Sequence, residues 1–111
     1  MEILTGISQE IWDMKYRFRA PGGEHAEQSI EESWDRGARA LAVPEADPEH
    51  WPCEFRAAMD GFQFLPAGRI LAGAGTDRSV TLFNCFVMGV IPDDMGGIFE
   101  HLREAALTMQ Q

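Results

Sequence analysis

The sequence is short of basic residues, cysteine and long apolar runs, and each shortage excludes a class of function. Nine Lys and Arg face eighteen Asp and Glu in 111 residues, which gives a net charge of −9. Nucleic acids and anionic membranes are bound by clustered basic residues, so neither partner is expected. No window approaches the roughly 20 apolar residues of a membrane span. A hydrophobic fraction of 45% nevertheless predicts a folded, soluble chain of at most one domain.

The two cysteines, Cys53 and Cys85, form no closely spaced pair. The N-terminal sequence MEILTGISQEIWDMKYR lacks the basic and then apolar order of an export signal. Free thiols without an export signal are typical of the reducing cytoplasm, so a cytoplasmic location is expected.

Common cofactor motifs are also missing. In GAGTDR, residues 73–78, the third glycine of a dinucleotide loop is replaced by Arg78, and the motif precedes the expected strand rather than following one. LPAGR is not followed by the Gly-Lys-Ser/Thr of a phosphate loop. The histidines, His25, His50 and His101, lie on separate polar stretches without shared spacing, so no metal site is expected.

Three stretches carry helical signals. Ser29 with Glu32 fits a capping box before apolar residues at helical spacing, and Asp47-Pro48 fits the start of a second helix. Asp93 or Asp94 can cap a third helix that runs to residue 111. The apolar stripes of these helices are Ile30, Trp34, Ala38 and Leu41; Trp51, Phe55, Ala58, Met59 and Phe62; and Ile98, Leu102, Ala105, Ala106 and Met109.

One strand is expected, at residues 82–91. Its apolar residues are continuous, as in a strand that is covered on both faces. The preceding stretch contains Pro66 and Gly68 and is expected to be irregular. The predicted fold is therefore mostly α with one long strand. A lone buried strand needs neighbours on both edges, so the chain is expected to be incomplete as a fold.

Asn84 and Cys85 interrupt this apolar strand, and their residue types leave two interpretations open. Free cysteine is commonly a small buried hydrophobic residue. Alternatively, the strand delivers a thiol to a site, which would justify a buried amide that costs about 1–3 kcal/mol when unpaired. Cys53, in HWPCEF, is expected to be a partly buried helix residue without chemistry, and Trp34 and Trp51 to pack helix on helix.

A family resemblance favours the second interpretation. FLPAGRILAGAGT, TLFNCFVMGVIPDDMGGIF and HLREAALTMQQ resemble the N-terminal part of adenosylcobalamin-dependent (class II) ribonucleotide reductases, and IWDMKYRF and SIEESWDRGARALA resemble its helical lead-in. The resemblance implies a helical N-terminal region at residues 1–66. It implies that residues 67–111 begin a ten-stranded α/β barrel, with its loop, first strand and dimer helix.

The resemblance also implies residue roles. Cys85 matches one of two thiols that reduce the ribose and form a disulfide, which an external thiol then reduces. The family starts this radical chemistry with adenosylcobalamin, whose site would lie outside this chain. Asn84 and Ile70 match positions near the ribonucleotide substrate, although many relatives carry a hydroxyl at Ile70. Cys53 matches neither the second redox thiol nor the radical thiol, so the chain alone is expected to be inactive.

Two further implications concern regulation and assembly. Asp93 matches an aspartate of the allosteric specificity site, which binds a deoxynucleoside triphosphate, and Asp94 and Met95 adjoin it. The helix at residues 96–111 matches one that packs across a homodimer. The alternative is a non-catalytic helical dimerisation module derived from the reductase. A redox-sensing thiol protein would need an exposed Cys85, which the apolar neighbours disfavour.

Overall fold

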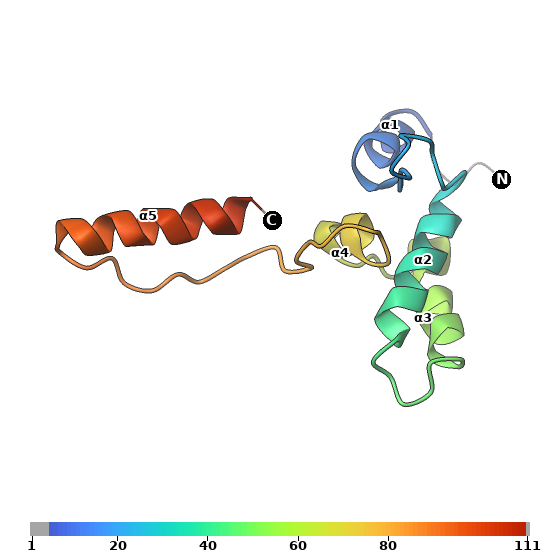
Figure 1. Ribbon diagram of the computed structural model, residues 1–111. Coiled ribbons are helices and arrows are strands. Elements are labelled where there is room, and N and C mark those ends of the chain that lie inside the picture. The colour runs from blue at the N-terminus through green and yellow to red at the C-terminus, as the bar shows by residue number, and fades with distance from the viewer. Residues whose placement is uncertain (1–4, 111) are drawn as a thin grey trace.

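The structure is a computed structural model that describes residues 5–110. Residues 1–4 of the expected helical region 1–66, and residue 111 of the expected helix 96–111, lie outside the described residues. The elements, in chain order, are α1 (Ile7–Ile11), the π-helix η1 (Trp12–Tyr16), α2 (Ile30–Ala42), α3 (Trp51–Met59), the 3₁₀-helix η2 (Asp60–Phe62), α4 (Gly68–Gly73) and α5 (Met95–Met109) (Figure 1).

The molecule has two parts. Figure 1 shows the elements from α1 to α4 gathered at one end, while α5 lies apart and runs back along the extended segment that leads to it. The radius of gyration is 17.8 Å, whereas a compact domain of this length would have about 13 Å. We call the first part, residues 5–76, the helical body. None of the described helices is both long and apolar enough to cross a membrane.

The predicted helix at residue 29 is confirmed as α2, but its capping box is wrong. Ser29 is the N-cap residue, yet its side chain makes no capping hydrogen bond. The Glu32 carboxylate instead accepts a bond from the backbone N–H of Gln28 at 2.8 Å, one residue earlier than expected. The start of the helix could be predicted from the sequence, because the apolar stripe begins there. The hydrogen-bond partner of the flexible Glu32 side chain could not be predicted.

The second predicted helix starts later than expected. Asp47 accepts a hydrogen bond from the His50 N–H at 3.1 Å, so it caps a turn, and α3 begins only at Trp51. Cys53 is exposed on α3 rather than partly buried. The Trp51 ring is also partly exposed and lies against Phe55 of its own helix, with ring centroids 5.6 Å apart.

The stretch expected to be irregular after Pro66 contains the short helix α4. Its glycine-rich sequence weakens helix propensity, but packing against α2 and η1 stabilises it. Before α2, residues 17–28 turn at Pro21-Gly22-Gly23, and an isolated antiparallel bridge pairs Arg19 with His25.

The core of the helical body is small and aromatic. It is formed by Trp12, Ile30, Trp34, Ala38 and Met59. Trp34 is fully buried, and the edge of its ring meets Phe62 at a centroid distance of 5.0 Å. The Trp12 indole N–H donates to the Ser33 hydroxyl at 2.9 Å, which satisfies its buried donor. The prediction that Trp34 packs helix on helix is therefore confirmed, and Trp12 joins it from η1.

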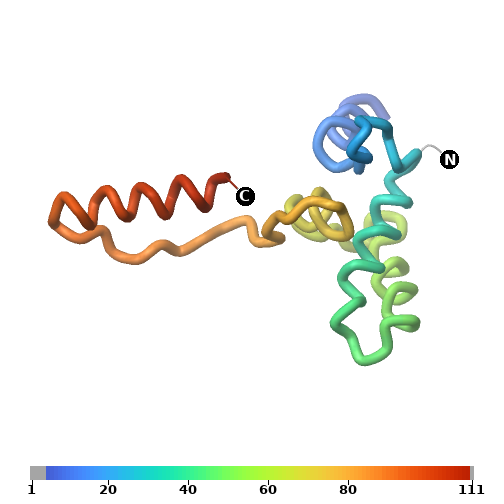
Figure 2. The backbone as a smooth tube through the Cα atoms, viewed as in Figure 1, coloured from blue at the N-terminus to red at the C-terminus, as the bar shows by residue number. Residues whose placement is uncertain are grey.

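The predicted long strand is not formed by the described residues. Residues 82–91 are extended and follow the smooth path between α4 and α5 in Figure 2, but they pair with no other strand. A strand exists only through hydrogen bonds to a neighbour, and the described part of the chain offers no second extended segment beside it. The predicted fold is thus correct in being mostly helical, whereas its strand is corrected to an unpaired extended segment.

Candidate functional site

The two residues expected at the reaction lie together on the extended segment. Asn84 and Cys85 are both exposed, and neither side chain has a hydrogen-bond partner among residues 5–110. Phe83, just before them, is 73% exposed, and Val87, just after, is fully exposed. The thiol therefore sits in an apolar stretch without a cover, which contradicts the expectation that its neighbours would bury it.

Ile70 lies elsewhere, in the middle of α4, where it is half-buried. Its backbone N–H bonds to the Ala67 carbonyl at 2.9 Å, and its carbonyl accepts from the Ala74 N–H at 2.9 Å. Both backbone groups are thus used in the helix. No contact in the described structure joins Ile70 to Asn84 or Cys85, so the structure does not bring these three residues together.

The residues expected to bind an effector lie at the start of α5. Asp94 is the N-cap, and its carboxylate accepts the Gly97 N–H at 2.7 Å, as predicted from the sequence. Asp93 and Met95 flank it and are exposed. A shallow cavity of about 230 Å³ lies between the segment before α5 and the first turns of this helix. Its lining is Gly89, Val90, Pro92, Gly97, Glu100, His101 and Glu104.

The apolar stripe of α5 is uncovered. Its members Ile98, Leu102 and Met109 are exposed, as are Phe99 and Leu107 elsewhere on the helix, and α5 packs extensively on no other described helix. On the opposite side, Arg103 makes a two-oxygen ion pair with Glu100, at 2.7 Å for the shortest contact. This pair lowers the pKa of Glu100 and raises that of Arg103, in each case chiefly through their hydrogen bonds.

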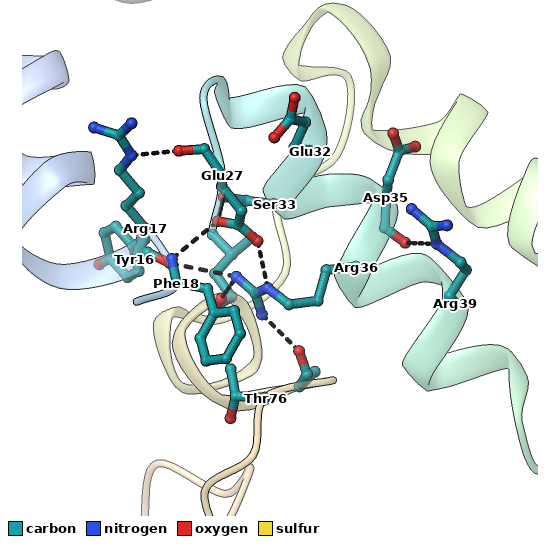
Figure 3. Close-up of polar contacts among 12 residues, drawn as sticks. Tyr16, Arg17, Phe18, Glu27, Glu32, Ser33, Asp35, Arg36, Arg39 and Thr76 are labelled. Carbon is teal, nitrogen blue, oxygen red and sulfur yellow. Dashed lines mark hydrogen bonds and ion pairs between the residues drawn. The ribbon is translucent and has the colours of Figure 1, made fainter. Parts of the chain in front are cut away.

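A second cluster, which the sequence did not reveal, lies inside the helical body. Arg36 Nε donates to a Glu27 carboxylate oxygen at 2.5 Å, and the two side chains are only 10% and 6% exposed. The other carboxylate oxygen accepts from the Ser33 hydroxyl at 2.5 Å and from the Phe18 backbone N–H at 3.0 Å. Figure 3 shows these groups converging on the carboxylate.

These contacts keep Glu27 ionised. Burial raises the pKa of Glu27, because it disfavours the charged form. The hydrogen bonds from Arg36, the Phe18 N–H and Ser33 outweigh burial, so the pKa lies below its usual value. The carboxylate therefore pairs with the Arg36 guanidinium at neutral pH.

The remaining guanidinium nitrogens of Arg36 bind backbone carbonyls. They donate to Ala74 at 2.5 Å, to Leu71 at 2.9 Å and to Tyr16 at 3.3 Å. These carbonyls lie at the C-terminal ends of α4 and η1, where helix carbonyls lack intrahelical partners and a cation is favourable. Sequence reasoning missed this role, because an arginine between Asp35 and Gly37 looks like part of a solvated face.

No described group of three or more His, Cys, Asp or Glu side chains is arranged to hold a metal ion. One apolar cavity of the helical body, about 330 Å³, is open and lies between η1, α2 and the stretch before α4. Its lining is Ser8, Ile11, Trp12, Tyr16, Ile30, Ser33, Phe62, Leu65, Pro66, Gly68 and Leu71.

Comparison with known proteins identifies the helical body. The family model described as "Ribonucleotide reductase, all-alpha domain" matches residues 4–79, which is more than half of the chain. The search of curated proteins gives no match, and neither does the search of solved structures. The matched range covers the Trp34 core and the Glu27–Arg36 cluster and ends just before the extended segment. The chain therefore belongs to the ribonucleotide reductase all-alpha domain family.

Proposed function

We propose that this chain is the N-terminal part of a ribonucleotide reductase and that it supplies Cys85 as one of two redox-active thiols. One observation carries the proposal: the all-alpha domain match ends at residue 79, and an apolar extended segment with an exposed thiol follows directly. A helical domain that only needed to fold would gain nothing from such a segment.

The exposed apolar residues around Cys85 support a covering partner. Phe83, Phe86, Val87, Val90 and Ile91 all face solvent in this chain, although burial of each such side chain would contribute about 1.5–3 kcal/mol. Their backbone groups also lack ladder partners. We propose that the segment becomes the first strand of the reductase barrel. Neighbouring strands from other parts of the enzyme would then cover it.

The chemistry requires two electrons. Removal of the ribose 2′-hydroxyl as water consumes two thiol hydrogens and leaves a disulfide, which an external dithiol reduces by exchange. Cys85 is proposed as one of these thiols. The other is proposed to come from another part of the enzyme, because Cys53 lies on α3 in the helical body and matches neither redox thiol in the family resemblance. Asn84 and the stretch around Ile70 are proposed to lie beside the ribonucleotide substrate.

Adenosylcobalamin dependence is part of the proposal and rests on the family resemblance. When bound, this cofactor would supply the initiating radical. The cavities of the described residues, about 230–420 Å³, suit small ligands and are too small for a corrin. We therefore propose that the cofactor site lies in other parts of the enzyme. Asp93, Asp94 and Met95 are proposed to adjoin a site for a deoxynucleoside triphosphate, in a cytoplasmic homodimer.

A second candidate is favoured by the uncovered stripe of α5. An amphipathic helix with exposed apolar side chains suits a dimer contact, so the second candidate is a non-catalytic dimerisation module. This candidate predicts a dimer that binds no nucleotide. Light scattering of the purified chain, together with a titration with deoxynucleoside triphosphates, separates the two. A monomer that binds such a nucleotide would eliminate the module.

The decisive experiment is turnover of the reductase that carries this chain, with dithiothreitol as the external reductant. We expect Cys85→Ser to abolish multiple turnover, because serine cannot form the disulfide. Cys53→Ser is the matched control, because it also removes an exposed thiol, and it should leave turnover near wild type. If Cys85→Ser sustains wild-type turnover, the redox role proposed here is wrong.

A further inference from the structure

We infer that Arg36 is a positioning residue for Cys85. It fixes the C-terminal end of α4 on α2 and, together with Gly73 and Gly75, sets the point at which the chain leaves the helical body. One part of the inference rests on the proposed function, namely that the position of Cys85 affects turnover. The anchored geometry itself does not depend on that function.

Arg36 provides the first anchor. Its guanidinium binds the carbonyls of Leu71 and Ala74, while Glu27 fixes the orientation of the guanidinium from the other side (Figure 3). An arginine fork that uses each of its nitrogens has little freedom to reorient. The last turn of α4 is therefore tied to the middle of α2, although α4 has only six residues of its own.

Gly75 provides the second anchor. Its φ of +72° is in the left-handed region, which residues with a side chain rarely adopt. A Cβ at this position would lie 2.8 Å from Arg36 Cγ, 3.0 Å from the Arg36 carbonyl oxygen and 3.2 Å from Ala40 Cβ. The backbone at residue 75 thus lies directly on the surface of α2, where only glycine fits.

Gly73 provides the third anchor. A Cβ there would lie 2.9 Å from Val80 Cγ2 and 3.3 Å from Leu82 Cδ2, so these two side chains fold back onto the end of α4. The Thr76 hydroxyl also donates to the Gly73 carbonyl at 2.8 Å. Leu82 is half-buried whereas Phe83 is exposed, so the anchored part of the chain ends at residue 82.

The consequence is a short tether for the thiol. Cys85 lies three positions beyond Leu82, and at about 3.4 Å per position the chain between them reaches roughly 10 Å. If the anchors were lost, the free chain would begin near Ala74, eleven positions before Cys85, and would reach roughly 37 Å. The anchors thus confine Cys85 to a small volume beside the helical body, where the rest of the enzyme can meet it.

The two cysteines allow this confinement to be measured in the whole chain. Both are exposed, with Cys53 on α3 and Cys85 beyond the anchors, so each can carry a nitroxide label. Pulsed electron paramagnetic resonance then reports the distribution of distances between them. We expect a narrow distribution in the wild-type chain and a severalfold broader one in Arg36→Gln and in Gly75→Ala.

Two controls match these variants. Arg39→Gln removes an exposed arginine of the same helix that bonds only to the Asp35 carbonyl of its own helix, and Gly37→Ala adds a methyl group where nothing lies within 4 Å. Both should keep the wild-type distribution. Far-UV circular dichroism confirms that each labelled chain is folded. If Arg36→Gln unfolds the helical body, the distance distributions of Gly75→Ala and Gly73→Ala test the anchors instead.

An unchanged distribution in folded anchor variants would overturn the inference, and so would a wild-type distribution as broad as that of the variants. In the reductase, Arg36→Gln should lower kcat severalfold, because it displaces the thiol. It should also raise the KM for the nucleotide, because Asn84 moves with the thiol and Ile70 moves with α4. The two proposals fail separately: normal turnover of Cys85→Ser would refute the redox role, whereas the label distances would still test the anchors.

Discussion

Replacing Glu27 by glutamine tests the structural importance of the buried ion pair. The substitution keeps the shape of the side chain and removes its charge. Glu27 accepts three hydrogen bonds, from Arg36, Ser33 and the Phe18 N–H. Glutamine has one acceptor oxygen, and its NH₂ group would face at least one of these donors. Arg36 would then remain buried without its counter-charge.

The expected loss of stability is large for a chain of this size. Removing one partner of a buried ion pair typically costs about 3–5 kcal/mol, because the other charge is left uncompensated. The lower end applies here, because Arg36 keeps its carbonyl partners at the ends of α4 and η1. A loss of about 3 kcal/mol compares with a total stability of roughly 5–15 kcal/mol for a whole domain.

Urea unfolding followed by tryptophan fluorescence measures this loss, since Trp12 and Trp34 are buried in the helical body. With a slope of about 1–1.5 kcal/mol per molar urea, Glu27→Gln should lower the midpoint by about 2–3 M. Glu100→Gln is the control. It removes a carboxylate from an exposed pair with Arg103 and should leave the midpoint of this transition unchanged, because α5 lies apart from the helical body. A midpoint for Glu27→Gln equal to that of the control would refute the reasoning.

Three further predictions concern pH, the cap of α5 and the two thiols. Because the pKa of Glu27 is lowered in the folded state, its ionised form contributes stability above the unfolded pKa of about 4.3. That contribution is lost as the pH falls through the lower folded value, so the urea midpoint of the wild type should fall more between pH 6 and pH 3 than that of Glu27→Gln. Asp94→Ala removes the hydrogen bond to the Gly97 N–H and should destabilise α5 by about 0.5–2 kcal/mol, seen as faster amide exchange in α5 but not in α2. Asp93→Ala is its control, and equal exchange in the two variants would contradict the capping role. Both thiols should react with a coloured disulfide reagent without denaturant, because Cys53 and Cys85 are exposed; a single reactive thiol would show that one of them is covered in solution.

The sequence by itself determined the helices with strong local signals. The apolar stripe from Ile30 to Leu41 predicted α2, and the expectation that Asp93 or Asp94 caps a helix predicted the start of α5, where Asp94 is the cap. These features depend on contacts between residues three or four positions apart, and such contacts are fixed once the residue order is known. The acidic composition and the absence of basic clusters could also be read directly.

Only the tertiary structure decided where partners lie far apart in the chain. Arg36 binds carbonyls 35 and 38 residues away, so no local pattern distinguishes it from the exposed Arg39 three positions later. The helix α4 forms in spite of its glycines because it packs on α2. The apolar stretch at residues 82–91 has the composition of a strand but does not form one. A strand needs hydrogen bonds to a second strand, and the described chain places none beside it. Local sequence sets what a segment can become, and contacts between distant residues decide what it is.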